Sequence, residues 1–318
     1  MHMEQQVVKM VRDGAIAAGL SFLLLKMPTT ATVFTIPLLF AAPRLRMPKF
    51  ALLPVLAVLL LIIGDNLIFS RDLFNEPVLR GVMILGLYIP VSLLAGAAIW
   101  IGLTEHRMLI RFLAGLIFAT ICGFALVLWF RGGSETAVAA GEYIRSTYVE
   151  VLAVVLGSAF PAGIDGNVLF DVVVIIVESA FLPLFMVQYG VSVLASELLI
   201  HRKSVDYQHR MCHWRLPSNA VWVFLGSWTL VLVTLFIKVP VLATVAWNSA
   251  LAISLLYLVQ GISIAAFFVR KRNVNASAFR IFILLGLMVL VPGVNMVPMI
   301  VLPLLGVSET WIRFRVNE

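Results

Sequence analysis

Charged residues are scarce in this sequence. Only 12% of its 318 residues are Asp, Glu, Lys or Arg, whereas 62% are hydrophobic. Soluble domains are about a quarter charged and about half apolar. A soluble fold of this length has too little interior to bury so much apolar surface. The composition therefore excludes a soluble globular protein and indicates a membrane protein.

Cysteines and catalytic motifs are few or absent. Cys122 and Cys212 are too few and too far apart in the sequence to indicate a disulfide framework. There is no Walker loop, no HExxH or GxSxG motif and no carboxylate-rich pattern of a metal-dependent lipid transferase. No short apolar core with a small-residue cleavage site follows the polar start, so we expect no removable signal peptide. An enzyme is not expected, and neither is a cofactor.

Long apolar runs predict an all-α fold, a polytopic transmembrane helix bundle that forms a single domain over 1–318. Six segments are long enough to cross a hydrocarbon core of about 30 Å: 51–70, 81–104, 107–130, 168–200, 219–238 and 240–269. Two further apolar segments, 14–41 and 279–307, contain breaks at Met27-Pro28-Thr29 and Pro292-Gly293. Each is either one long tilted span or a re-entrant pair of short helices.

Basic residues predict the orientation in the membrane. The most basic loop is HRKSVDYQHRMCHWR at 201–215, which the positive-inside rule places in the cytoplasm. Treating both broken end segments as hairpins puts most of the 23 basic residues on that side, so we favour hairpins and cytoplasmic termini. The net charge of +7 follows this pattern, which predicts membrane lipids and not nucleic acid as partners.

The segment 131–167 is the one long piece expected outside the membrane. It has apolar residues at helical spacing, opposite Glu142 and Arg145. The apolar set is Ile144, Tyr148, Val151, Leu152 and Val155. We expect an amphipathic helix that lies on the outer surface or caps the bundle.

One carboxylate, Glu178, interrupts the apolar run VVVIIVESAFLPLF at 172–185. A charge near the bilayer centre costs about 2.5–3.5 kcal/mol on insertion scales, so an intramembrane carboxylate indicates a function unless it ties helices together. As a tie, Glu178 would be protonated or paired with Lys26 or a neighbouring asparagine. As a functional group, it would contact a ligand, an ion or a partner protein.

The helix face that carries Glu178 is polar at intervals. At 100° per residue, Asp171, Tyr189 and Ser196 fall on the same stripe, although Pro183 is expected to kink the helix. The stripe predicts a face turned toward protein or a wet cavity that is reachable from outside.

A second polar set lies in the span 245–268. Its members share an arc of one helix face and are Asn248, Ser249, Gln260 and Ser263. They predict either hydrogen bonds between helices or a ligand site shared with Glu178.

Two weaker patterns complete the set. In the basic loop, His209, Cys212 and His213 have spacings that allow metal binding on a helix, but the sequence offers no clear fourth ligand; we expect no metal site there. Small residues spaced four apart permit close helix packing, within the fold or against a partner; they are Ala15 and Gly19, and Gly115, Ala119 and Gly123.

Three stretches together resemble the YybS-like family of bacterial inner-membrane proteins. They are HWRLPSNAVWVFL (213–225), the span from Asn248 to Gln260-Gly261, and LLGVSETWIRFR (304–315), in which Glu309 stands where that family usually has Asp. The family is distantly similar to the substrate-binding S components of energy-coupling-factor transporters. The resemblance implies a bacterial cytoplasmic membrane, a ligand pocket near the outer leaflet, and a separate energy-coupling membrane subunit with ATPases.

Three functions are compatible with these patterns. The first is a solute-binding membrane component without its own ATPase, with Glu178, Asp171, Asn248, Gln260 and Tyr189 as candidate ligand residues. The second is a scaffold that binds partner proteins through its basic cytoplasmic loops. The third, ion-coupled transport through Glu178, has less support because the sequence shows no related halves. We favour the first.

Overall fold

A computed structural model of the chain describes residues 2–45, 48–69, 76–156, 165–202, 204–273, 277–291 and 293–315. Within these ranges every regular element is a helix, which confirms the predicted all-α membrane bundle. Five of the described helices are long and apolar enough to cross a membrane. The chain divides into two compact units, Met1–Glu197 and Leu198–Glu318.

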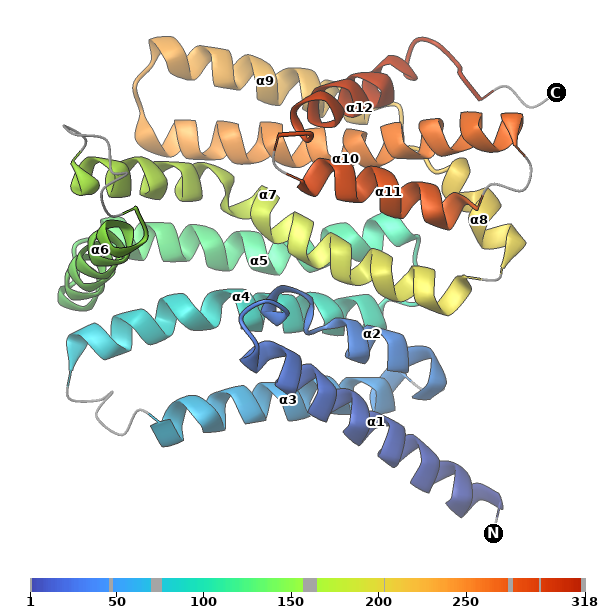
Figure 1. The fold of residues 1–318 in the computed structure, drawn as a ribbon, viewed down its shortest axis with the longest axis horizontal. Helices are drawn as coiled ribbons and strands as arrows, with labels where there is room; N and C mark the ends of the chain where they lie inside the picture. Colours follow the sequence, from blue (N-terminus) through green and yellow to red (C-terminus); the bar gives the residue numbers. More distant parts are fainter. Residues whose placement is uncertain are drawn as a thin grey trace. The chain divides into compact units, whose positions relative to one another are not determined.

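The first unit contains seven α-helices and two short 3-10 helices in its described part (Figure 1). In chain order they are α1 (His2–Lys26), η1 (Ala31–Val33), α2 (Ile36–Ala41), η2 (Ala42–Leu45), α3 (Pro48–Phe69), α4 (Pro77–Gly102), α5 (Met108–Arg131), α6 (Glu135–Leu156) and α7 (Gly166–His201), which runs into the second unit. α4 packs against α3, α5 and α6, and α1 packs against α3. α7 contains Pro183 and changes direction along its length, as the sequence predicts.

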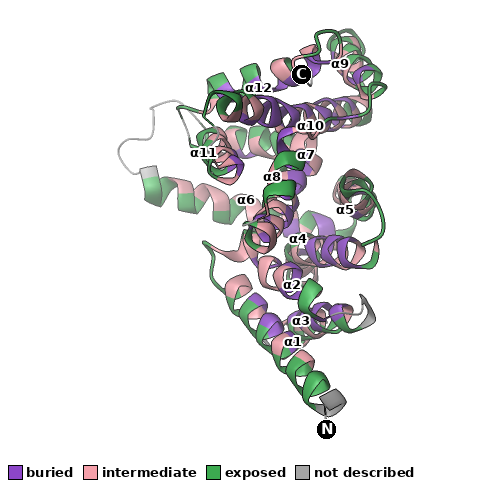
Figure 2. Ribbon diagram, turned by 90° about the vertical axis from the view of Figure 1, so that its right-hand side faces the viewer, coloured by how far each residue is buried: buried purple, intermediate pink, exposed green. Residues whose placement is uncertain are grey.

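The second unit is built around its longest helix, α10. Its elements are α8 (Val205–Cys212), α9 (Ala220–Phe236), α10 (Pro240–Arg272), α11 (Ala278–Leu290) and α12 (Met296–Ser308). α10 contacts all four of the others, and its buried residues follow its whole length (Figure 2). An apolar helix that is buried along its length needs neighbours on several sides, so α10 forms the core of this unit.

Both end segments are interrupted where the sequence predicts. α1 ends at Lys26, and only short helices follow the turn at residues 27–30. α11 and α12 are separated by residues 291–295, where Gly293 has a φ of +88° that side chains disfavour; Pro292 lies outside the described residues. Each of these two helices has 13 residues, or roughly 20 Å, and is too short to cross alone. The orientation across the bilayer stays a prediction.

The expected span 219–238 forms α9, which has 17 residues and is shorter than the five long candidates. On α1 it is Gly14 that lies against α3, since a Cβ there would be 3.1 Å from Pro54 Cγ. Ala15 and Gly19 are exposed, so their packing against a partner stays a prediction.

The amphipathic helix expected in 131–167 is α6 (Glu135–Leu156). It packs on α4 through small residues: Ala137 and Ala140 are almost fully buried, and a Cβ on Gly81 would lie 2.5 Å from the Ala140 Cβ. Of the predicted apolar face, Val151 and Val155 are 54% and 72% exposed. The contact of that face with a membrane surface stays a prediction.

α10 and α12 meet backbone to backbone. A Cβ on Gly261 would lie 2.0 Å from the Leu302 carbonyl oxygen, and a Cβ on Gly306 would lie 2.2 Å from the Tyr257 carbonyl oxygen. Real Cβ atoms do not approach so closely, and these neighbours are backbone atoms that cannot rotate away. Glycine at both positions is therefore a condition of this helix contact.

We expect Gly261→Ala and Gly306→Ala each to destabilise the second unit by about 1–3 kcal/mol, because the methyl group overpacks the α10–α12 contact. Thermal unfolding in detergent checks this. Gly286→Ala on α11, where nothing lies within 4 Å, is the matched control and should be neutral or stabilising because alanine favours helix. Equal unfolding midpoints for all three variants would contradict the contact.

Candidate functional site

Glu178 forms a two-point ion pair with Arg131, the last residue of α5. Arg131 Nε donates to Glu178 Oε1 at 3.2 Å, and Arg131 Nη2 donates to Glu178 Oε2. The Glu178 side chain is only 12% exposed and that of Arg131 34%. The fork of the guanidinium matches the two carboxylate oxygens, so the pair ties the middle of α7 to the end of α5.

Asp171 makes the equivalent contact two turns earlier on α7, with an arginine from α6. Arg145 Nη2 donates to Asp171 Oδ1 at 2.6 Å, and the guanidinium lies 4.9 Å from the centre of the Phe170 ring. The side chains are 39% and 57% exposed, so water weakens this pair. Arg145 thus reaches α7, whereas the sequence placed it on the polar side of α6, away from the apolar face.

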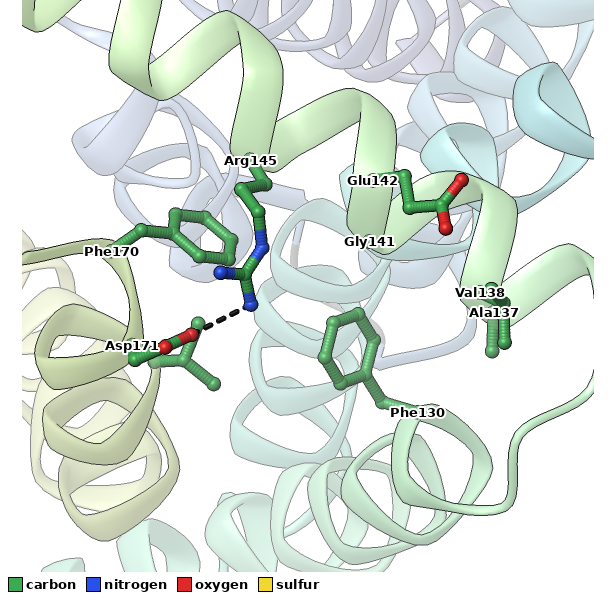
Figure 3. A pocket seen from close by; sticks show the side chains of 9 residues that line it. Phe130, Ala137, Val138, Gly141, Glu142, Arg145, Phe170 and Asp171 are labelled. Atoms are coloured by element: carbon green, nitrogen blue, oxygen red, sulfur yellow. Dashed lines mark hydrogen bonds and ion pairs between the residues drawn. The ribbon is translucent and has the colours of Figure 1, made fainter. Parts of the chain in front are cut away.

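A cavity of about 220 Å³ opens beside the Arg145–Asp171 pair, between the end of α5, the middle of α6 and the start of α7 (Figure 3). Its ionisable lining residues are Glu142, Arg145 and Asp171. Its apolar wall is made of Phe130, Ala137, Val138, Gly141, Phe170 and Val174. Glu142 is exposed and pairs with no cation in the described part of the chain. One guanidinium and two carboxylates therefore meet at an otherwise apolar hollow.

The structure corrects the expected partner of Glu178. Lys26, named from the sequence as a partner, instead donates to Asp65 on α3 and lies 5.5 Å from the Phe22 ring centre. Asp171 and Glu178 lie seven residues apart in the continuous helix α7 and so share the predicted face; they contact arginines of two different helices, α6 and α5.

Tyr189, the third candidate on this stripe, lies inside the packing of α4, α5 and α7. It is fully buried, its hydroxyl donates to the Gly96 carbonyl oxygen at 2.9 Å, and its ring stacks on Phe112 at 5.1 Å. A Cβ on Gly115 would lie 2.6 Å from the Tyr189 hydroxyl oxygen. The predicted close packing along Gly115, Ala119 and Gly123 is confirmed, since α5 buries all three. A ligand role for Tyr189 stays a prediction.

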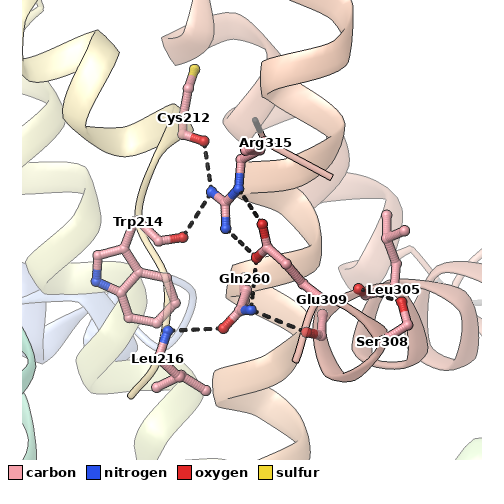
Figure 4. A network of polar contacts seen from close by, with 9 residues as sticks. Cys212, Trp214, Leu216, Gln260, Leu305, Ser308, Glu309 and Arg315 are labelled. Atoms are coloured by element: carbon pink, nitrogen blue, oxygen red, sulfur yellow. Dashed lines mark hydrogen bonds and ion pairs between the residues drawn. The ribbon is translucent and has the colours of Figure 1, made fainter. Parts of the chain in front are cut away.

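Gln260 is the centre of a buried polar network in the second unit (Figure 4). Its Oε1 accepts from the Leu216 backbone N–H at 2.8 Å. Its Nε2 donates to the Gly306 carbonyl oxygen at 3.0 Å and to Glu309 Oε2 at 2.9 Å. The amide therefore joins α10 to the loop before α9 and to the end of α12.

Arg315 closes this network from the C-terminal tail. It makes a two-point ion pair with Glu309, in which Arg315 Nε donates to Glu309 Oε1 at 2.7 Å. Its Nη1 also donates to the carbonyl oxygens of Cys212 at 2.7 Å and Trp214 at 3.0 Å. Both charged side chains are only 4% exposed. The tail is thus tied to the loop through fully paired buried charges.

The network brings together the three stretches that carry the family resemblance. Trp214 and Leu216 come from the first stretch, Gln260 from the second, and Glu309 and Arg315 from the third. Meeting in one place gives these residues a common packing role within the second unit.

Asn248, on the same helix as Gln260, is 1% exposed, and its Nδ2 donates to the Thr244 carbonyl oxygen at 2.8 Å within α10. Glu178 belongs to the first unit, and Asn248 and Gln260 belong to the second. A ligand site shared by all three therefore stays a prediction.

The residues considered for a metal lie at the end of α8. The rings of His209 and His213 stack with centres 4.1 Å apart, and Cys212 is 3% exposed. Across the described ranges, no group of three or more His, Cys, Asp or Glu side chains is placed to hold a metal ion.

The sequence did not identify the arginine partners of these carboxylates. Arg131, Arg145 and Arg315 each pair with a carboxylate on another helix or at a helix end. The scarcity of charged residues could have indicated these pairs, because a charged side chain in a membrane protein usually lies beside one of opposite charge.

No family model, curated protein or solved structure matches the chain. Its class follows from the apolar helices: it is a multi-pass helical membrane protein.

We expect Arg131 and Glu178 to be energetically coupled. Arg131→Gln and Glu178→Gln should each lower stability because the remaining charge loses its partner, and the double variant should recover part of the loss. A double-mutant cycle of detergent unfolding should give about 1–3 kcal/mol of coupling. The exposed Arg12–Asp13 pair, neutralised in the same way, should show almost none. Additive losses at Arg131 and Glu178 would rule out the pair.

Removing the buried negative charge of the tail network should lower the stability more than removing either charge of the Arg131–Glu178 pair. Glu309→Gln leaves Arg315 with carbonyl acceptors only, and we expect a loss of about 3–5 kcal/mol and faster tryptic cleavage after Arg313. Asp206→Asn, on the exposed side of α8, is the control. A Glu309→Gln variant as stable and as protease-resistant as the parent would show that the network does not hold the tail.

Proposed function

We propose that this membrane protein is a solute-binding component that captures a small charged solute in the cavity between α5, α6 and α7. The observation that carries the proposal is the convergence of Glu142, Arg145 and Asp171 on a hollow with phenylalanine walls. A few polar groups in an apolar concavity are the usual composition of a ligand site.

The size and charge of the cavity restrict the solute. Its volume of about 220 Å³ is below the roughly 300–1,000 Å³ of sites for drug-sized ligands, so the solute has few heavy atoms. The Arg145–Asp171 pair is partly exposed and therefore opens at small cost. A charged group on the solute replaces one member of that pair, and a partly apolar solute body lies against the phenylalanine rings.

Energy for uptake comes from other proteins in this proposal. The sequence contains no Walker loop, and its resemblance to a family related to S components supports a partnership with an energy-coupling membrane subunit and ATPases. The bacterial cytoplasmic membrane is the compartment that this partnership requires.

A scaffold that binds partner proteins is the alternative. It is favoured by Arg202, Arg210 and Arg215 around α8, which are exposed and therefore accessible to a partner protein. Lys203 lies outside the described residues. In this case the protein holds a partner and no solute.

Native mass spectrometry of the protein extracted in mild detergent tests the proposal. We expect a stoichiometric small molecule on the parent protein and its loss in Val138→Trp, because Val138 lines the cavity and is 48% exposed, so the indole fills the cavity without removing a charge. Val154→Trp, at a 79% exposed position on the same helix, is the control and should retain the molecule. Lipid alone with a reproducible protein partner would contradict the proposal and favour the scaffold.

A further inference from the structure

Arg270, near the end of α10, is a half-buried cation whose guanidinium has N–H donors without a strong acceptor. Its Nη1 lies 3.9 Å from the Cys212 sulfur, which is a weak acceptor. Its Nε is buried and has no hydrogen-bond partner. In the part of the chain that the structure describes, no carboxylate pairs with Arg270. A buried guanidinium donor without an acceptor is unfavourable, so this position favours an anion.

A second arginine meets the same residue but is already neutralised. Arg315 donates to the Cys212 carbonyl oxygen and pairs with Glu309. Of the two arginines that converge on Cys212, Arg270 alone lacks a counter-charge among the described residues. The Glu309 carboxylate hydrogen-bonds to Arg315 and Gln260, so the nearby acidic residue is engaged.

The surroundings are strongly basic. Residues 198–318 contain three acidic residues, Asp206, Glu309 and Glu318. Each segment that reaches this place carries an exposed cation: Arg215 in the loop between α8 and α9, Arg272 on α10 and Arg313 in the tail. Contact between the Phe268 and Phe314 rings, with centres 6.4 Å apart, brings the tail to the end of α10. The positive charge therefore comes from three segments that the fold gathers.

Exposed apolar side chains border this charge. Phe268 and Val269, directly before Arg270, are both 43% exposed, and Trp311, after apolar α12, is 65% exposed. An apolar helix that ends in arginine and lysine reaches the level of the lipid headgroups. Tryptophan is enriched at the same level. A ligand with a phosphate and acyl chains matches both parts of this surface.

We infer that Arg270, with Arg215 and Arg313 around it, is a binding site for the phosphate of an anionic phospholipid. The guanidinium donors of Arg270 bind the phosphate oxygens, the flanking arginines add attraction, and the acyl chains lie along Phe268 and Val269. The tail network is a condition of the site, because Arg315 holds the tail against the loop.

Lipid titration of the purified protein in detergent, followed by native mass spectrometry, tests this inference with phosphatidylglycerol and phosphatidylcholine. We expect the parent to prefer phosphatidylglycerol and Arg270→Gln to bind it about fivefold more weakly, since one basic residue near the headgroups contributes about 1 kcal/mol. Arg270→Lys keeps the charge without the planar fork and should fall between the two. Lys238→Gln removes an exposed charge between α9 and α10, at the other end of α10, and should change nothing.

Thermal unfolding with phosphatidylcholine alone shows whether Arg270→Gln folds, and Arg270→Lys provides the comparison if it does not. Equal phosphatidylglycerol affinity in the parent and in a folded Arg270→Gln or Arg270→Lys variant would overturn the lipid site. So would displacement of the lipid by millimolar inorganic phosphate, which would identify a free-phosphate site, or retention of an acidic protein in place of lipid.

Discussion

In the described part of this protein, two largely buried carboxylates each pair with an arginine from another helix or segment. Glu178 on α7 meets Arg131 of α5, and Glu309 at the end of α12 meets Arg315 of the tail. In a medium without water, an uncompensated charge would raise the free energy of the folded state by several kcal/mol. The pairing therefore determines which helices lie side by side, and it explains why a chain so poor in charge retains these residues.

Close backbone contact is the second condition, and it acts where the charges do. Gly261 and Gly306 let α10 and α12 approach until carbonyl oxygens occupy the space of a side chain. Only at that distance does Gln260, next to Gly261, reach both the Gly306 carbonyl oxygen and Glu309. In lipid there is no hydrophobic driving force between apolar helices, so close packing at small residues and buried hydrogen bonds stabilise the helix contact.

The helices and their interruptions were predictable because they depend on local sequence. Runs of apolar residues specify long helices, and Met27-Pro28-Thr29 lies where α1 ends. The shared face of Asp171 and Glu178 followed from helical periodicity. The partners did not, because a sequence does not show that Arg131 and Arg145 reach α7. The contact of α6 with α4 was not predicted for a related reason: Ala137 and Ala140 pack because Gly81 of α4 lies opposite, which is a property of two helices and not of one. The single-domain organisation stays a prediction.

The Arg145–Asp171 pair connects this architecture to function. It joins α6 to α7 at the rim of a cavity, and it is exposed enough to exchange its partner for a ligand. An experimental structure of the protein in nanodiscs made directly from its own membrane tests this most directly. The account predicts compact non-protein density between Phe130 and Asp171 that contacts Arg145 or a carboxylate. A cavity closed by side chains or occupied by an acyl chain, with the Arg145–Asp171 pair intact, would contradict it.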